Sequence, residues 1–312
     1  MRFVTYRSKS EQASSRDRVG ALTFEGERIV DLTADFGSLL GLIDRGDDGL
    51  ALARGRLAEA KETVALADVV LQAPLPEPRQ IRDLMTFELH YRQSIAAVAR
   101  MRVGPLAPLA RLLGIARVPR VWYQQPIYYK CNRFSVVGPD TDVIWPRDAE
   151  LMDYECELAA VIGKTGKDIP RERAMEHVFG FTIYNDMTAR DLQLREMQAH
   201  LGPAKGKDFD TGNVFGPCIV TRDEIDPYDL TMTSRVNGEE RGRGYSREMH
   251  HRWEDVIAYV SRSETLYAGE ILGSGTVGNG CGLEHRRFLE PGSVVELEIS
   301  GIGKLRNRLV KP

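Results

Sequence analysis

The chain has 312 residues, of which 42% are hydrophobic and 28% are charged, a composition typical of a folded globular protein rather than a disordered one. Its 42 basic and 45 acidic residues leave a net charge of −3, too weak a field to attract nucleic acid or an anionic membrane surface. No stretch approaches the roughly 20 apolar residues that cross a bilayer, and the N-terminus lacks the apolar segment of a secretory signal. We therefore expect a cytoplasmic protein that binds neither nucleic acid nor membrane.

The four cysteines are far apart in the sequence and form no C-x-x-C pair. They are Cys131, Cys156, Cys218 and Cys281. This spacing favours reduced thiols in a cytosolic protein over a disulfide framework or a zinc knuckle. We expect them to be packing residues.

Residues 1–72 are expected to form a small α/β module. Hydrophobic periodicity predicts short strands at 2–6, 19–24 and 28–31, and helices at 36–45 and 50–66. The proline-rich link 73–78 follows, and its prolines can neither continue a helix nor donate hydrogen bonds to a sheet. A second domain is therefore expected over residues 79–312.

The second domain is expected to be rich in strands, so the fold class is α+β. Alternating apolar residues predict strands at 155–162, 230–236 and 294–299, and Asn237-Gly238 is a turn signal. Fewer helices are expected: 88–100, 170–178, 189–198 and 253–262. The apolar segment 103–118 predicts a short amphipathic helix that packs on the core or on a dimer partner, or that forms a lid over an apolar substrate.

Two glutamates on one predicted strand form the first candidate site. Glu155 and Glu157 are two residues apart, so their carboxylates project from the same face of the strand. Two like charges side by side repel each other unless a cation lies between them. Taken alone, the pair fits either a solvated polar face or a metal site.

Two aspartates extend this candidate site. Asp186 ends the predicted strand FTIYND, at a strand-to-helix junction where functional groups are common. Asp83 lies seven residues before His90, and its alternative role is to cap the following helix.

Several motifs together resemble the fumarylacetoacetate hydrolase family in order and spacing. The runs are DYECELAAVIGKTGKDIP, GFTIYNDMTARDLQ, KGKDFDTGNVFGP, GSGTVG and LEPGSVVELEISGIGKLRNRLV. The resemblance covers about residue 79 to the C-terminus. It implies a catalytic domain built as a mixed β-sandwich roll, and a homodimer.

The resemblance also implies a metal site. By position, the family's metal ligands correspond to Asp83, Glu155, Glu157 and Asp186. Four oxygen donors suit a hard divalent cation, so we expect Mg²⁺, with Mn²⁺ or Ca²⁺ as alternatives, and not zinc.

The resemblance assigns acid–base chemistry to a histidine and a glutamate. His90 corresponds to the general base of the family's hydrolases, and Glu284 to the glutamate that orients it. Glu88 is a weaker substitute for Glu284. A lone histidine is more often structural, and the spacing from Asp83 is what favours a catalytic role.

Further residues are matched to the substrate. Lys207 corresponds to the family's lysine beside the metal, which stabilises negative charge on a substrate oxygen; its alternative is a solvated surface lysine. Four residues are expected to contact substrate: Tyr129, Arg190, Gln193 and Thr276.

Two positions depart from fumarylacetoacetate hydrolase itself. Met85 and Met197 stand where that enzyme places tyrosines, so two phenol hydroxyls are replaced by soft apolar groups. This difference predicts a substrate that is less polar than fumarylacetoacetate.

The predicted function is a metal-dependent hydrolase that cleaves a carbon–carbon bond of a β-diketone or acylpyruvate through a metal-held enolate. A decarboxylase, hydratase or tautomerase of a 2-oxo acid on the same metal site is the first alternative, because these reactions share the enolate. A non-catalytic binding protein is the alternative of another class. The presence of all four carboxylates, the lysine and the dyad argues against it, because a non-catalytic protein has little reason to hold so many negative charges together.

Overall fold

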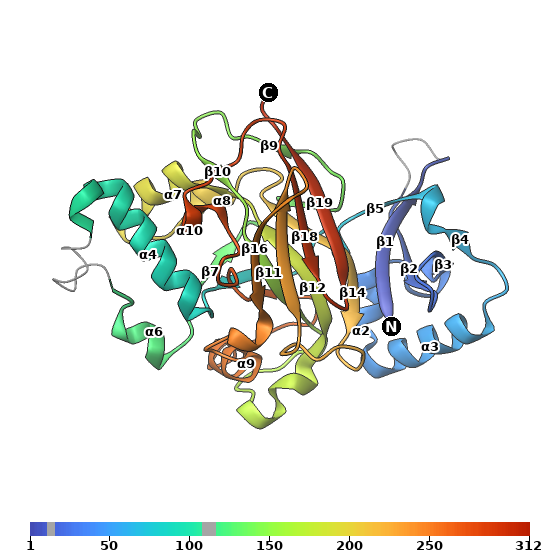
Figure 1. Ribbon diagram of the computed structural model, residues 1–312. Helices are drawn as coiled ribbons and strands as arrows, with labels where there is room; N and C mark the ends of the chain where they lie inside the picture. The colour runs from blue at the N-terminus through green and yellow to red at the C-terminus, as the bar shows by residue number, and fades with distance from the viewer. Residues whose placement is uncertain (11–15, 108–116) are drawn as a thin grey trace.

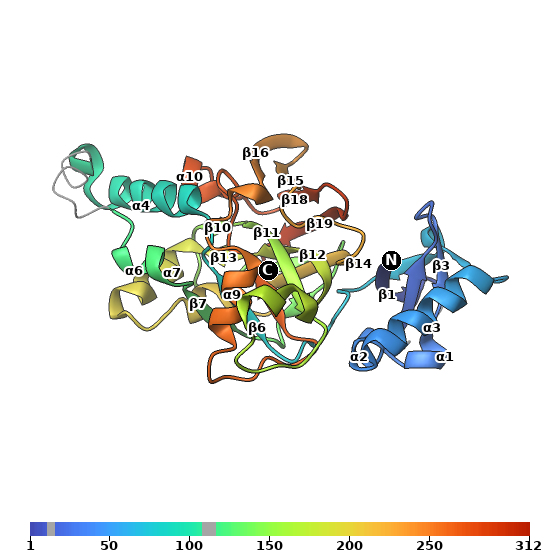
Figure 2. The same ribbon diagram turned by 90° about the horizontal axis from the view of Figure 1, so that it is seen from below.

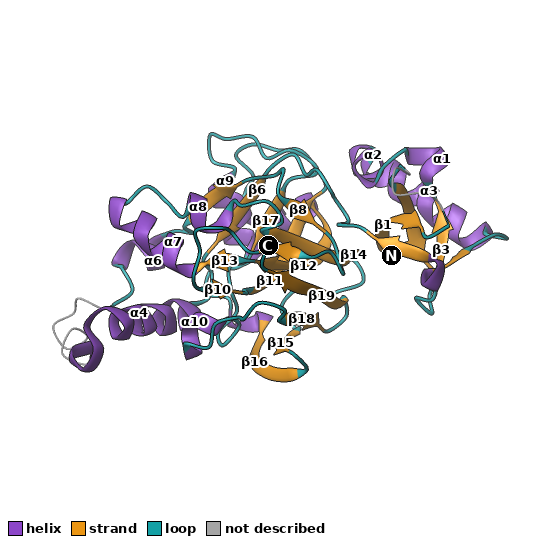
Figure 3. Ribbon diagram, turned by 90° about the horizontal axis from the view of Figure 1, so that it is seen from above, coloured by secondary structure: helices purple, strands orange, loops and turns teal. Residues whose placement is uncertain are grey.

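A computed structural model describes residues 1–10, 16–107 and 117–312 of the chain (Figure 1). The predicted α+β fold class is confirmed: strands form the middle of the molecule, and helices lie mainly at its two ends (Figure 3). In the part of the chain that is described, no helix is both long and apolar enough to cross a membrane.

The described strands are β1 Arg2–Ser8, β2 Arg18–Leu22, β3 Arg28–Asp31, β4 Val64–Ala65, β5 Val69–Leu71, β6 Ile81–Leu84, β7 Tyr128–Cys131, β8 Val136–Val137, β9 Val143–Ile144, β10 Met152–Asp153, β11 Cys156–Ile162, β12 Val178–Asp186, β13 Thr188–Ala189, β14 Asn213–Thr221, β15 Thr231–Val236, β16 Glu239–Tyr245, β17 Ile271–Gly273, β18 Val294–Ile299 and β19 Gly303–Val310. The described α-helices are α1 Thr33–Phe36, α2 Leu39–Asp44, α3 Gly46–Glu59, α4 Glu88–Val103, α6 Arg120–Gln124, α7 Arg190–Glu196, α8 Ala204–Lys207, α9 Trp253–Val260 and α10 Gly282–His285.

Most of these strands belong to one large sheet. Its order is β4-β3-β2-β1-β14-β12-β11-β17-β6-β7, with β5 paired to β1 and β8 paired to β14. A second sheet has the order β16-β15-β18-β19-β9, and β10 pairs with β13. The N-terminal strands thus continue the main sheet through the antiparallel pairing of β1 with β14. The boundary between the two predicted domains stays a prediction.

The N-terminal part of the chain lies at one end of the molecule. Strands β1 to β3 and helices α1 to α3 form this end, while α4, α6, α7 and α10 lie at the opposite end (Figures 1 and 2). Core side chains from both parts, such as Phe3 and Ile219, belong to one hydrophobic cluster. The proline-rich link between the two parts is itself packed, since Ala73 and Leu75 are buried.

Strand β11 is buried on both faces, which explains its nearly continuous apolar sequence. Leu158, Ala160 and Ile162 point into one core cluster, whereas Ala159 and Val161 point into another. Glu157 has the same parity as Ala159 and Val161, so its carboxylate points toward a buried face. A solvated polar face for the glutamate pair is therefore wrong: Glu155 is 4% exposed and Glu157 is fully buried.

Several sequence-based boundaries are corrected. The helix expected at 50–66 is α3, Gly46–Glu59, because Val64 and Ala65 pair with β3 instead of continuing the helix. The helix expected at 36–45 is split into α1 and α2 at Gly37, which has a φ of 71°. A 3₁₀ helix, Arg171–His177, replaces the α-helix expected at 170–178, and α7 ends at Glu196.

The turn at Asn237-Gly238 is confirmed. Both residues have positive φ, 53° and 82°, as a tight hairpin turn between β15 and β16 requires. The apolar segment 103–118 is only partly visible. Helix α4 ends at Val103 and a 3₁₀ turn, Gly104–Leu106, follows, while residues 108–116 lie outside the described part of the chain.

Candidate active site and carboxylate cage

Four buried carboxylates converge on one point, three of them on strands β6, β11 and β12 of the main sheet and the fourth directly before β11. They are Asp83, Glu155, Glu157 and Asp186, hereafter the carboxylate cage. One oxygen of each lies within 4.8 Å of one oxygen of every other, and all four side chains are buried. The predicted convergence of these residues is therefore what the structure has.

Strand register explains this convergence. Glu157 lies opposite Tyr184 in the pairing of β11 with β12, and Asp186 is two residues further along the same face. Asp83 lies within β6 and is paired with Gly273 of β17, so its alternative role as a helix cap is wrong. The residue that begins α4 as its N-cap is Phe87.

Gly273 leaves the space that the cage needs. Strand β17 separates β6 from β11, and a Cβ at this position would be 2.7 Å from Asp83 Oδ1 and 2.9 Å from Glu157 Oε2. Any side chain at this position would displace two of the four carboxylates.

Two buried cations partly balance the cage. Lys207 Nζ is 2.6 Å from Glu155 Oε2 and also pairs with Asp186. The guanidinium of Arg190 is 2.6 Å from Glu155 Oε1. The alternative reading of Lys207 as a solvated surface lysine is therefore wrong, since this residue is 3% exposed.

The cations act unequally on the four carboxylates. Burial alone would raise the pKa of Glu155, but Arg190 and Lys207 together lower it below the usual range. Burial raises the pKa of Asp186 to about 8, in spite of Lys207. Burial and the neighbouring negative charges raise the pKa of Glu157 well above its usual value, and burial also raises that of Asp83. The protein's own groups therefore disfavour the charged form of three of the four carboxylates, those of Asp83, Glu157 and Asp186.

Unpaired oxygens indicate the kind of ligand that this arrangement fits. Among the described residues, Asp83 Oδ1, Glu157 Oε1 and Asp186 Oδ1 are buried without a hydrogen-bond partner. Buried polar atoms without partners are costly and rare. Hard oxygen donors that lie close together, with no nitrogen or sulfur ligand among them, fit a divalent cation of the Mg²⁺, Mn²⁺ or Ca²⁺ type.

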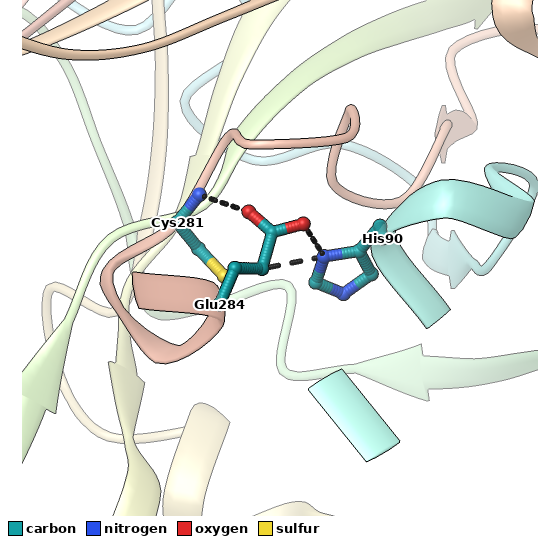
Figure 4. Close-up of side chains that lie close together, drawn as sticks. All are labelled: His90, Cys281 and Glu284. Atoms are coloured by element: carbon teal, nitrogen blue, oxygen red, sulfur yellow. Dashed lines mark hydrogen bonds and ion pairs between the residues drawn. The ribbon is translucent and has the colours of Figure 1, made fainter. Parts of the chain in front are cut away.

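The predicted dyad is formed by helices from distant parts of the chain. His90 Nδ1, on α4, lies 3.0 Å from Glu284 Oε1, on α10 (Figure 4). Glu284 also accepts hydrogen bonds from the backbone N–H groups of Asn279, at 3.1 Å, and Cys281, at 3.0 Å. These bonds fix the carboxylate, which in turn orients the imidazole. The substitute, Glu88, points elsewhere and pairs with Tyr123 and Arg92.

The dyad lies beside the cage. Glu155, the residue before β11, forms an isolated antiparallel bridge with Cys281, the residue before α10. His90 is close enough to Glu155 that a positive imidazolium lowers the pKa of that carboxylate. The other ring nitrogen of His90, Nε2, has a single long contact, 3.4 Å from Ser94 Oγ, among the described residues.

The four residues expected to contact substrate lie around the same site. The Tyr129 hydroxyl donates to Asp186 Oδ2 at 2.8 Å, and Thr276 Oγ1 is buried without a partner among the described residues. Arg190 Nη1 donates to Gln193 Oε1 at 3.1 Å. Tyr129 and Arg190 are thus engaged with cage residues, whereas the Thr276 hydroxyl is available to a ligand.

Asp153 is a residue that the sequence analysis missed. Its Oδ1 accepts the backbone N–H of Gly282 at 2.7 Å, and its Oδ2 accepts the N–H of Leu283 at 2.9 Å, both on α10. Its Oδ2 also accepts from Arg190 Nε at 2.8 Å. This fully buried carboxylate therefore links the helix of Glu284 to the guanidinium that contacts Glu155. The signal in the sequence was the same two-residue spacing that places Asp153, Glu155 and Glu157 on one face.

Comparison with known proteins identifies the family. The profile of the fumarylacetoacetate hydrolase C-terminal domain matches residues 98–310. The chain belongs to the fumarylacetoacetate hydrolase family, as its motifs predicted.

Two relatives are named as tautomerases. The chain is 34% identical to the mitochondrial oxaloacetate tautomerase Fahd2a of Rattus norvegicus, over 88% of this chain and 80% of the relative. It is 33% identical to the oxaloacetate tautomerase YisK of Bacillus subtilis (strain 168), over 91% of this chain and 90% of that protein. A solved structure of fumarylacetoacetate hydrolase from Exiguobacterium antarcticum is similar over 100% of both chains, with 30% identity and a TM-score of 0.75.

Proposed function

We propose that this chain is a cation-dependent tautomerase that interconverts the enol and keto forms of oxaloacetate or a closely similar 2-oxo dicarboxylate. Two relatives that match most of the chain are named as oxaloacetate tautomerases. This proposal takes up one of the alternatives from the sequence and ranks carbon–carbon hydrolysis second.

The observation that carries the proposal is the dyad next to the carboxylate cage. Glu284 accepts from His90 Nδ1, so the neutral imidazole carries its proton there and Nε2 is left as the base. Tautomerisation requires such a group, because a proton must leave carbon 3 of the keto form and a proton must reach the substrate oxygen.

In this proposal, His90 and Glu284 transfer the proton and Lys207 stabilises negative charge on the substrate. His90 Nε2 accepts the proton from carbon 3, Glu284 stabilises the imidazolium, and His90 then returns a proton to the substrate oxygen. A divalent cation in the cage, Mg²⁺ by preference, would supply Lewis-acid stabilisation of negative charge on the substrate oxygens. Lys207 stays protonated, because its pKa is raised by Asp186 and Glu155 in spite of burial, and it adds positive charge beside the same oxygens.

The substrate's carboxylates need donors of their own. Thr276 offers one, because its buried hydroxyl lacks a partner among the described residues and directly follows Gly275, whose N–H donates to Glu157. Tyr129, Gln193 and Arg190 are proposed to complete the substrate pocket. Met85 and Met197 predict a substrate less polar than fumarylacetoacetate, which the small dicarboxylate oxaloacetate is not, so the substrate panel decides between that prediction and this proposal.

The test measures the reaction and its products separately. Freshly dissolved enol-oxaloacetate is added to the Mg²⁺-supplemented protein, and the loss of enol absorbance in the ultraviolet is followed. The same protein is incubated with oxaloacetate, alkyl diketones and acylpyruvates, and products are analysed by mass spectrometry. We expect faster ketonisation with no change of mass. Efficient cleavage of a diketone or acylpyruvate with addition of water, without faster ketonisation, would contradict the proposal.

Hydrolysis is the second candidate because a histidine–glutamate dyad can also remove a proton from water. Similarity to the Exiguobacterium antarcticum fumarylacetoacetate hydrolase supports it. Loss of carbon dioxide in the same product analysis would instead indicate a decarboxylase. We further propose that the chain forms a homodimer, which light scattering coupled to size-exclusion chromatography tests directly.

A further inference from the structure

A second group of potential metal ligands lies next to the carboxylate cage and has a different chemical character. His90 Nδ1, Cys281 Sγ and a Glu284 carboxylate oxygen lie within 4.8 Å of one another (Figure 4). The distance from Nδ1 to Glu284 Oε1 is 3.0 Å, and that from Nδ1 to Sγ is 4.0 Å. Cys281 is fully buried and His90 is 4% exposed, so bulk water does not surround the three donors.

We propose that His90, Cys281 and Glu284 form an inhibitory binding site for a borderline-soft divalent cation of the Zn²⁺ type, distinct from the carboxylate cage. Nitrogen, sulfur and oxygen together are the donor set that Zn²⁺ prefers, whereas the cage offers oxygen alone. The two neighbouring sites therefore select different ions.

The present separations nearly fit a tetrahedral ion. Zinc bond lengths of about 2.1 Å to nitrogen and oxygen and about 2.3 Å to sulfur imply ligand separations of roughly 3.4 Å for N–O and roughly 3.6 Å for N–S. The observed N–O and N–S separations are 3.0 Å and 4.0 Å. These two separations differ from the ideal values by about half an ångström, and the third, from the Glu284 oxygen to Cys281 Sγ, is within 4.8 Å. Side-chain shifts would complete three ligand bonds, with the fourth position left for water or substrate.

The backbone already holds two of the three ligands in place. Cys281 and Glu284 form a reciprocal capping box, in which the Cys281 N–H donates to Glu284 Oε2 at 3.0 Å and the Glu284 N–H donates to the cysteine sulfur. Between these two residues, the N–H groups of Gly282 and Leu283 donate to the carboxylate of Asp153. Little conformational entropy is therefore left to lose when a cation binds.

Binding at this site would block the dyad. The ion takes the place of the proton on His90 Nδ1, which moves to Nε2 and blocks the proposed base, and it displaces the thiol proton of Cys281, so one proton is released to solvent. Glu284 then coordinates the ion and no longer supports the imidazole, and a new positive charge lies beside Glu155. Cation binding at this site does not depend on which reaction the chain catalyses, whereas its inhibitory effect rests on the proposed function.

The binding test uses Co²⁺ as a spectroscopic probe of the full-length protein with the cage saturated by Mg²⁺. A thiolate-to-cobalt charge-transfer band should appear in the near ultraviolet, because only a Co–S bond produces it. Cys281→Ser should abolish the band and keep an oxygen at the capping position. Cys131→Ser is the matched control, since this buried cysteine lies near Asp83 and Asp186, and it should leave the band intact.

The inhibition test uses Zn²⁺ with the enol-oxaloacetate assay at saturating Mg²⁺, each variant being compared with its own zinc-free rate. Loss of even an indirect partner of a metal ligand costs roughly 10–100-fold in affinity, so Cys281→Ser should weaken inhibition by at least about tenfold. Cys131→Ser should not change it. Absence of the band in the unmodified protein would overturn the site, whether or not the chain is a tautomerase. A band without zinc inhibition, or inhibition equal in Cys281→Ser, would overturn the inhibitory role.

Discussion

Two clusters of charged side chains in this molecule differ in burial and in how fully their carboxylates are paired. On the second sheet, Arg235 of β15 lies 2.6 Å from Glu298 and 3.4 Å from Glu296, both on the neighbouring strand β18. That cluster is partly open to water, with 25% of the Arg235 side chain exposed. In the carboxylate cage all four side chains are buried and three oxygens have no partner among the described residues. The exposed carboxylates are thus matched by a protein cation, whereas Lys207 and Arg190 match the buried ones only in part and leave three oxygens for a ligand.

The largest effect is expected when one cage carboxylate is neutralised. Glu157→Gln keeps the acceptor for the Gly275 N–H but removes a negative charge, so cation affinity should fall about 100-fold or more and turnover with it. The free energy of unfolding of the cation-free protein should rise, because buried like charges repel each other. Calorimetry with Mg²⁺ or Mn²⁺ and urea unfolding measure the two quantities.

The exposed cluster supplies the matched control for this change. Glu298→Gln is the same chemical change at a side chain that is 38% exposed, and it should alter neither cation affinity nor turnover. Equal cation affinity in Glu157→Gln and the unmodified protein would show that the cage is not the cation-binding site.

The next effect separates chemistry from cation binding. His90→Ala removes the proposed proton carrier, so turnover should fall by about 10²–10⁴-fold while cation affinity stays nearly unchanged. His285→Ala, at an exposed position on the same α10 that carries Glu284, is the control and should keep full activity. A His90→Ala variant that ketonises enol-oxaloacetate at the normal rate would exclude the dyad.

A smaller effect concerns the link between dyad and cage. Asp153→Asn keeps the shape of the side chain but removes the charge that faces Arg190, so the free energy of unfolding should fall by about 3–5 kcal/mol. Cation affinity should also fall by roughly 10–100-fold, because Arg190 orients Glu155. Urea unfolding and calorimetry check both values. Unchanged values would mean that the buried link has no role in positioning.

The smallest effect is expected in the exposed cluster. Arg235→Met breaks ion pairs that are screened by water, so the free energy of unfolding should change by no more than about 1 kcal/mol, with no change in turnover. A much larger loss, measured by urea unfolding, would show that the contrast between the two clusters is wrong.

Strand periodicity predicted only the glutamate pair of the cage, and the full set of four carboxylates was reached through the family resemblance. The two-residue spacing of Glu155 and Glu157 implied a shared face, and the fully apolar surroundings of β11 made that face buried. His90 and Glu284 are 194 residues apart in the sequence, and their pairing was predicted only through the family resemblance. No local pattern encodes such a contact.

Other features depended on tertiary contacts that no periodicity reveals. Val64 and Ala65 end the predicted helix because β3 offers a pairing partner. The Asp153 link exists because α10 folds back onto the strand that precedes the cage, which brings Gly282 and Leu283 to its carboxylate. The need for Gly273 follows from the placement of β17 between β6 and β11.

The central claim is that one hard divalent ion binds among the four cage carboxylates beside His90. Crystals grown with Mn²⁺ test it most directly through an anomalous difference map. We predict a single strong peak at about 2.0–2.4 Å from oxygens of Asp83, Glu155, Glu157 and Asp186. An active protein whose map shows manganese elsewhere, or no manganese at the cage, would contradict the account.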